Sequence, residues 1–108
     1  MTTELEIKKA IGRQIKAYRK SQGLTQFSLG EKIDINQRQI AVLESGKSFP
    51  TLKTLVSLSN VFNCNVSDFF PANNNVEQTR EELISFINRM NDQQIYALKV
   101  FIQSFIKL

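Results

Sequence analysis

The chain has 108 residues, a formal net charge of +4 at pH 7, one cysteine and no histidine. A single cysteine excludes an internal disulfide and fits a reducing compartment, and the lack of histidine removes the commonest general base and metal ligand. No apolar run approaches the ~20 residues of a membrane span, and the acidic N-terminus is not a signal peptide. We therefore expect a cytoplasmic protein with no metal, no cofactor and no membrane partner.

The first predicted helix runs from about Thr3 to Ser21. Thr3 and Glu6 have the spacing of a capping box, in which each side chain bonds to the backbone N–H of the other residue. The apolar residues Ile11, Ile15 and Tyr18 fall on one face of this helix, as expected for a helix that packs on a core.

Two short helical patterns follow, joined by a polar turn at Asp34-Ile35-Asn36. The first begins after Thr25, a good N-cap, and keeps Leu29 and Ile33 apolar. The second begins at Asn36, keeps Ile40 and Leu43 on one face, and is expected to stop at Gly46. Two short helices across such a turn form a helix-turn-helix, whose second helix can lie in the DNA major groove.

The remaining elements are also predicted to be helical. Phe49-Pro50 interrupts the chain, after which Thr51 can cap a fourth helix with Leu52, Leu55, Leu58 and Phe62 buried. Asn65 can cap a short fifth helix that ends at Phe69-Phe70. The next segment, residues 71–75, has the composition of a linker. We expect a DNA-binding domain over residues 1–70 and a separate segment over 76–108.

Residues 76–108 are predicted to form a helical hairpin, with a break and a cap at Asn91-Asp92. Its apolar stripe is too broad for two helices to bury between themselves, so it needs another surface. A second copy of the chain would supply that surface, and the expected dimer contacts are Phe86, Ile87, Ile95, Leu98, Phe101, Ile102 and Phe105. The competing interpretation is that this segment folds back over Phe27 and completes the core.

The positive charge is unevenly spread. Residues 1–70 contain ten lysines and arginines against six acidic residues, whereas residues 71–108 contain four of each. The whole excess therefore lies on the part with the helix-turn-helix pattern, as attraction to phosphate requires. A solvated basic surface without a partner would show the same imbalance, so charge alone does not decide the function.

The pattern from residue 24 to residue 50 resembles the Cro/phage-repressor (XRE-like) family of helix-turn-helix regulators. The matching residues are Leu24, Thr25, Gln26, Leu29, Ile35, Ile40, Leu43, Glu44, Gly46 and Pro50. The resemblance covers roughly residues 5–70 and implies an all-α, five-helix repressor-type bundle. Two positions depart from the family: Gly30 replaces the usual alanine, at a cost to helix stability of about 1 kcal/mol, and Asp34 replaces glycine in the turn, where aspartate tolerates a left-handed conformation.

The resemblance also implies roles for individual residues. Gln37 and Arg38 match positions that face base edges, and their side chains suit adenine and guanine respectively. Val42 could contact a thymine methyl or be partly buried beside Leu43. Contacts to the DNA backbone are expected from Thr25, Gln26, Ser45 and Lys47, with Asn36 first an N-cap and second a phosphate contact. Arg19 and Glu44 match a structural salt bridge.

These features favour a sequence-specific DNA-binding transcription regulator, by default a repressor, that acts as a homodimer on a two-fold related operator. The alternatives are an antitoxin-like regulator whose tail seals a toxin partner, and a protein-interaction adaptor that has lost DNA binding. An enzyme is the weakest alternative, because there is no nucleophile–base pair and no phosphate-binding loop. A small-molecule sensor is disfavoured because the tail is too short to enclose a ligand readily.

Overall fold

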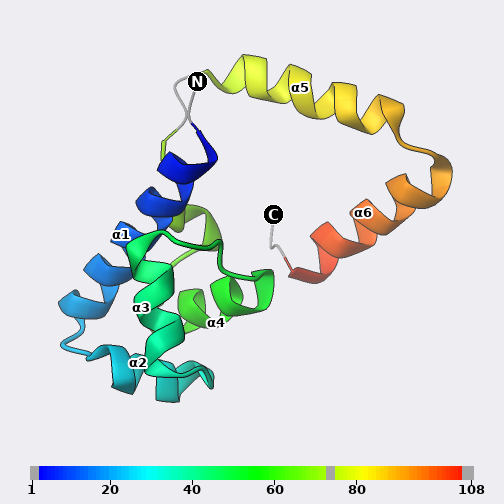
Figure 1. Ribbon diagram of the computed structural model, residues 1–108. Coiled ribbons are helices and arrows are strands. Elements are labelled where there is room, and N and C mark those ends of the chain that lie inside the picture. Colours follow the sequence, from blue (N-terminus) through cyan, green and yellow to red (C-terminus); the bar gives the residue numbers. More distant parts are fainter. Residues whose placement is uncertain (1–2, 73–74, 106–108) are drawn as a thin grey trace. The chain divides into compact units, whose positions relative to one another are not determined.

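The computed structural model describes residues 3–72 and 75–105, and within these ranges the chain is helical without strands. The predicted all-α class is confirmed (Figure 1). Its elements are α1 (Glu4–Ser21), α2 (Gln26–Ile33), α3 (Gln37–Ser45), α4 (Leu52–Phe62), the 3-10 helix η1 (Val66–Phe69), α5 (Val76–Arg89) and α6 (Asp92–Phe105). The chain divides into unit 1, residues 1–71, and unit 2, residues 72–108.

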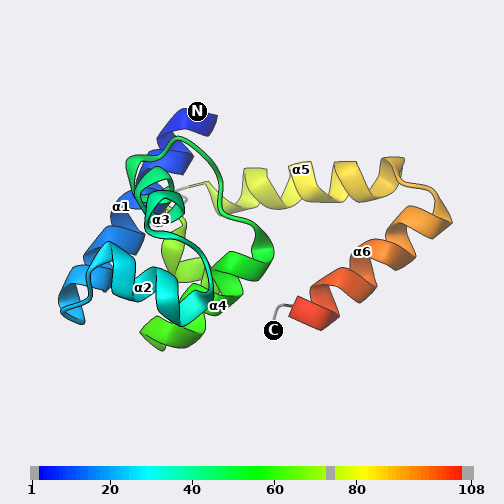
Figure 2. The ribbon, with the colours of Figure 1, turned by 60° about the horizontal axis from the view of Figure 1, so that its bottom comes forward.

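Unit 1 contains a continuous hydrophobic core. In Figure 2, α3 can be followed beside α1 and α2, the two helices on which it packs. The core residues are Ile11, Ile15, Leu29, Ile40, Leu43, Leu55, Leu58, Phe62 and Phe69. Each such side chain contributes about 1.5–3 kcal/mol when fully buried. Because every helix of unit 1 supplies at least one of these residues, the position of α3 is determined by the whole core.

An aromatic cluster joins α1 to the end of unit 1. The Tyr18 ring stacks on Phe62 with a centroid separation of 5.3 Å and meets Phe69 edge-on at 5.7 Å. The element that carries Phe69 was expected as a short helix, and it is a single 3-10 turn, Val66–Phe69. Cys64 lies half-buried beside this cluster, and burial raises the pKa of its thiol. A raised pKa keeps the thiol protonated and therefore less reactive.

Gly12 allows α1 and α3 to approach at backbone distance. A Cβ built at Gly12 would lie 2.5 Å from the carbonyl oxygen of Leu43 and 2.6 Å from that of Glu44. No side chain can be accommodated there without moving one of the two helices. The end of α3 is therefore seated directly on the backbone of α1.

Gly30 has a similar role at the turn between α2 and α3. A Cβ at this position would lie 2.4 Å from the carbonyl oxygen of Ile35, whose own N–H donates to the Gly30 carbonyl at 3.0 Å. Glycine at this position lowers helix stability, as expected from its helix propensity. It also leaves the space into which the turn folds back, which a larger residue would fill. Asp34 adopts the left-handed conformation, with φ 59° and ψ 45°, as expected for aspartate at a turn.

Unit 2 consists of α5 and α6, which are connected through Met90 and Asn91. The Asn75 side chain caps α5, and Asn91 and Gln94 exchange side-chain-to-backbone bonds at the start of α6. No side chain of α5 is buried. Among the predicted dimer residues, Phe86, Ile87, Ile95 and Phe101 are exposed and Leu98 and Ile102 are half-buried, while the Phe105 side chain lies outside the described part.

Within the described ranges, no helix is both long enough and apolar enough to cross a bilayer.

Candidate nucleic-acid interface

The α2–turn–α3 segment is defined by local capping at each boundary. Thr25 caps α2: the Ser28 N–H donates to the Thr25 hydroxyl at 3.0 Å, and the Thr25 N–H donates to the Ser28 hydroxyl at 2.9 Å. Asn36 caps α3 in the same way and exchanges bonds with Gln39, at 2.8 Å in each direction. The helix then ends at Gly46, which has a left-handed conformation with φ 79°. These caps fix the residues at which α2 and α3 begin, and the first turn of α3 is exposed.

A buried ion pair attaches α3 to α1. The Arg19 guanidinium donates to both carboxylate oxygens of Glu44, from Nε at 2.6 Å and from Nη2 at 3.0 Å. Arg19 and Glu44 are only 8% and 9% exposed. The bonds to Glu44 raise the pKa of Arg19, so its charge is permanent. The family resemblance implied this pairing, and the bidentate geometry adds strength and orientation to it.

Two further bonds extend this pair into a network. Arg19 Nη1 donates to the Leu24 carbonyl at 2.8 Å, and Gln26 Nε2 donates to Glu44 Oε1 at 3.1 Å. The network therefore joins α1, the α1–α2 loop, the start of α2 and the end of α3. Gln26, expected to contact phosphate and brace α3, is in a bracing position. Its amide nitrogen carries a second N–H that can donate to an anion.

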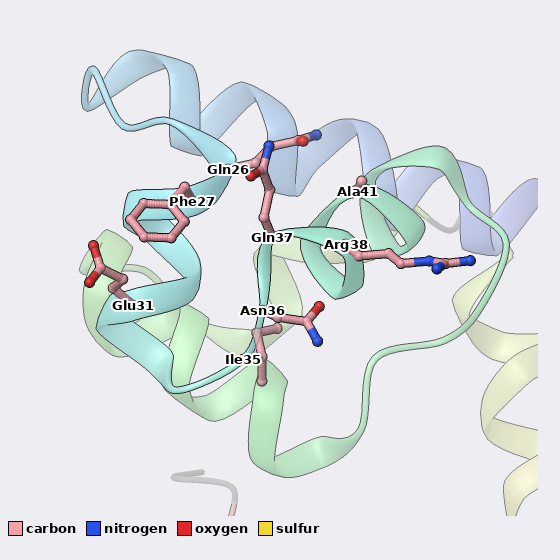
Figure 3. Close-up of a pocket in the computed structure, with 8 residues that line it drawn as sticks. All are labelled: Gln26, Phe27, Glu31, Ile35, Asn36, Gln37, Arg38 and Ala41. Atoms are coloured by element: carbon pink, nitrogen blue, oxygen red, sulfur yellow. The ribbon is translucent and has the colours of Figure 1, made fainter.

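The first turn of α3 exposes Asn36, Gln37 and Arg38. Figure 3 shows the Gln37 side chain pointing toward Gln26, on the α2 side of the helix, whereas Arg38 extends away from α2. The two predicted base readers therefore diverge and face different positions on any surface laid against α3. Asn36 uses its side-chain oxygen for the cap, which leaves its amide nitrogen as a donor.

The other sequence-predicted residues lie around α3. Val42 is half-buried on α3, and Ser45 is exposed with its hydroxyl bonded to the Val42 carbonyl at 2.8 Å. Lys47 is exposed in the loop after α3. Thr25 is exposed at the start of α2, where its hydroxyl serves the cap. None of these positions requires movement of the core to meet an external partner.

Sequence reasoning did not identify the lysines of α1 that lie beside the same loop. Lys8 Nζ lies 5.5 Å from the centre of the Phe49 ring, a cation–π distance. A Cβ at Gly46 would lie 2.8 Å from the Cα of Lys9, so Lys9 adjoins the end of α3. Lys8 is also ion-paired with Glu4, its Nζ 3.3 Å from a carboxylate oxygen. Lys47 directly follows Gly46, so Lys9 and Lys47 both adjoin the residue that ends α3. Their proximity is tertiary, and no local sequence signal reveals it.

An open groove of about 580 Å³ lies between α2 and α3. Its lining residues are Gln26, Phe27, Glu31, Ile35, Asn36, Gln37, Arg38 and Ala41 (Figure 3). A second groove of about 320 Å³ lies between α3 and the segment that leads into α4, and Val42 and Phe49 line it. Phe27 is 57% exposed. The only feature of the sequence that draws attention to Phe27 is that the resembled family usually has a polar residue at this position.

Residues 3–72 and 75–105 contain no group of three or more cysteine, aspartate or glutamate side chains that could hold a metal ion. The buried polar side chains in this part have hydrogen-bond partners.

Comparisons with known proteins agree on one class. A helix-turn-helix family model matches residues 15–69. The chain is 33% identical over 57 residues to a helix-turn-helix-type transcriptional regulator of Archaeoglobus fulgidus, a match that covers 53% of this chain and 81% of the relative.

Two solved structures share the fold. A transcriptional regulator of the same helix-turn-helix family from Vibrio cholerae superposes with a TM-score of 0.57 at 28% identity, over 62% of this chain and 38% of the Vibrio chain. The P22 c2 repressor, solved in complex with a synthetic operator, superposes with a TM-score of 0.55 at 24% identity, over 58% of this chain and 96% of the repressor.

Proposed function

The chain belongs to the helix-turn-helix family of DNA-binding transcription regulators, and from that premise we propose that it represses transcription as a homodimer on a two-fold related operator. In this proposal α3 enters the major groove of each half-site. Gln37 and Arg38 contact base edges, and the surrounding polar and basic residues contact the DNA backbone. Occupation of the site obstructs polymerase without any catalytic step.

The observation that carries the proposal is an exposed first turn on an otherwise immobilised helix. Ile40 and Leu43 anchor α3 in the core, and Glu44 is bound by Arg19 and Gln26. A rigid helix loses little conformational freedom when it binds, so its exposed side chains can contribute fully to affinity and discrimination. Gln37 and Arg38 have the side chains that pair bidentately with adenine and guanine.

Electrostatics supports contact with the DNA backbone. The net charge excess of the chain belongs to unit 1, and Lys9 and Lys47 adjoin Gly46 at the end of α3. On the side of α3 that faces α2, Gln26 and the N-terminus of α2 offer N–H donors, which favour anions. Phosphate contacts on both sides of α3 would orient it along the groove, while the base contacts would set the sequence.

The apolar side chains of unit 2 support the dimer. Phe86 and Phe101 are about half exposed, at 52% and 46%, and burial of such a side chain contributes about 1.5–3 kcal/mol. A two-fold partner would cover these side chains and set two α3 helices about one DNA turn apart. The same exposed surface would also suit a different protein partner, as in the antitoxin-like alternative.

Selection of bound fragments from random DNA tests the proposal most directly. We expect a site with two inverted half-sites that carry guanine and adenine at contacted positions. Enrichment of a single asymmetric half-site would contradict the dimer, and no enrichment at any salt concentration would contradict DNA binding and favour the adaptor.

Sedimentation of the full chain and of a chain ending at Pro71 tests the role of unit 2. All the core residues lie between Ile11 and Phe69, so the shortened chain should fold. We expect it to be monomeric at micromolar concentration and to bind the operator weakly, whereas the full chain should be a dimer. A full-length monomer, or a fully dimeric shortened chain, would exclude unit 2 as the dimer contact. Co-purification of a second protein with the full chain would favour the antitoxin-like alternative.

A further inference from the structure

The groove between α2 and α3 has a composition that differs from the phosphate-contacting surface around it. Its apolar wall consists of the Phe27 ring and the side chains of Ile35 and Ala41. Phe27 is 57% exposed, and Ile35 and Ala41 are half-buried. Figure 3 shows Phe27 on α2, Ile35 at the end of the turn, and Gln37 across from Phe27 on the α3 side, with its side chain extending toward Gln26.

The charges at the groove argue against a phosphate as its occupant. Glu31 lies at the rim on the same helix as Phe27, and its carboxylate would repel an anion. The one cation among the lining residues is Arg38, and Figure 3 shows its side chain extending away from Phe27. A neutral, apolar group is therefore the best match for the space beside Phe27.

If the chain binds DNA as proposed above, the apolar group that occupies the groove can be identified. The apolar group that base pairs present in the major groove is the C5-methyl of thymine. Gln37, which borders this groove, has the side chain that suits adenine. An A·T pair offers both features, with the adenine edge on one base and the methyl group on the other.

We propose that the groove formed by Phe27, Ile35 and Ala41 receives the C5-methyl group of a thymine at, or next to, the base pair that Gln37 contacts. Phe27 is thus a specificity-determining residue from α2, outside the recognition helix. It discriminates thymine from cytosine and from uracil by apolar contact alone. Val42, which lines the other groove, addresses a different position on the DNA.

The test uses the full chain and its selected operator, in which each thymine is replaced in turn by deoxyuridine. This replacement removes the methyl group and leaves base pairing intact. For the unmodified protein we expect one position per half-site at which affinity falls about fourfold, the value of one buried methyl group. In Phe27→Ala the fall at that position should disappear, whereas Phe27→Leu should retain part of it.

Two controls keep the outcome specific. Phe70→Ala removes another exposed phenylalanine, 45% exposed and remote in sequence from the α2–turn–α3 segment, and should leave the uridine profile unchanged. Val42→Ala should alter the profile, if at all, at a different position. Far-UV circular dichroism should show that Phe27→Ala remains folded, because its side chain lies mostly outside the core.

The results separate this inference from the proposed function. An operator that shows no dependence on any thymine methyl, or a dependence that Phe27→Ala leaves intact, overturns the role of the groove and leaves DNA binding standing. Failure to select any operator overturns both. Loss of the dependence in Val42→Ala alone assigns the methyl contact to the other groove and refutes the inference.

Discussion

Replacing Arg19 with alanine should remove a large part of the folding free energy. Both partners are less than a tenth exposed, so solvent screens their interaction little. In Arg19→Ala, Glu44 would keep only the bond from Gln26, and the Leu24 carbonyl would lose its donor. Breaking a buried pair in this way costs about 3–5 kcal/mol. Because Gln26 remains, we expect a value near the lower end, about 3 kcal/mol.

Urea unfolding followed by far-UV circular dichroism measures this loss. For a domain of this size, about 3 kcal/mol corresponds to a fall in Tm on the order of 15 °C. Arg13→Ala, an exposed arginine on the same helix, is the matched control and should change the free energy of unfolding by less than about 0.5 kcal/mol. Equal effects of Arg19→Ala and Arg13→Ala would refute the argument that the pair is a buried, stabilising network.

A double variant tests whether the unpaired Glu44 carboxylate causes the loss of stability. Replacing Arg19 with methionine and Glu44 with leucine removes both charges and keeps apolar volume. We expect this variant to be more stable than Arg19→Ala, because no uncompensated carboxylate remains. If it is no more stable, the unpaired Glu44 carboxylate is not the source of the cost in Arg19→Ala.

Three other predictions concern the turn and the DNA surface. Gly30→Ala should lower the free energy of unfolding by about 1–3 kcal/mol despite the better helix propensity of alanine, because the new Cβ meets the Ile35 carbonyl; a more stable variant in urea unfolding would show that the turn yields easily. Arg38→Ala should weaken binding to the best site by about 1–3 kcal/mol and relax the preference at one base pair per half-site, whereas Lys47→Ala should weaken all sites alike; a uniform loss in Arg38→Ala would contradict base contact. With about six phosphates neutralised per dimer, log K should fall against log salt with a slope near −5, and a slope near zero would contradict the electrostatic account.

Much of unit 1 could be predicted because its boundaries are local. Thr25 and Asn36 bond to residues three positions ahead, and Gly46 ends α3 with its own backbone conformation. Such signals involve neighbouring residues, so a single sequence displays them. The Arg19–Glu44 pair joins residues 25 positions apart, and it was predicted because the matching residues of a family carry that information.

The groove and the lysines of α1 could not be predicted in the same way. Lys9 meets the end of α3 only because Gly12 lets the two helices approach closely. Phe27 forms a wall with Ile35 only after the turn has folded back on Gly30. These surfaces depend on how the helices pack against one another. Hydrophobic periodicity indicates which face of a helix is buried but not which helix covers it. The surface proposed to cover unit 2 belongs to a second molecule, and contacts between two molecules leave no local pattern in the sequence.

The division at residue 71 has a consequence for the order of events during synthesis. Unit 1 is helical, its core ends at Phe69, and helical domains dominated by local contacts fold within microseconds to milliseconds. A ribosome adds only about 5–20 residues per second, so the folding of unit 1 is fast compared with the synthesis of the chain. If unit 2 carries the dimer contact, pairing follows the folding of unit 1, and the cellular concentration of folded chains sets the threshold at which an operator becomes occupied.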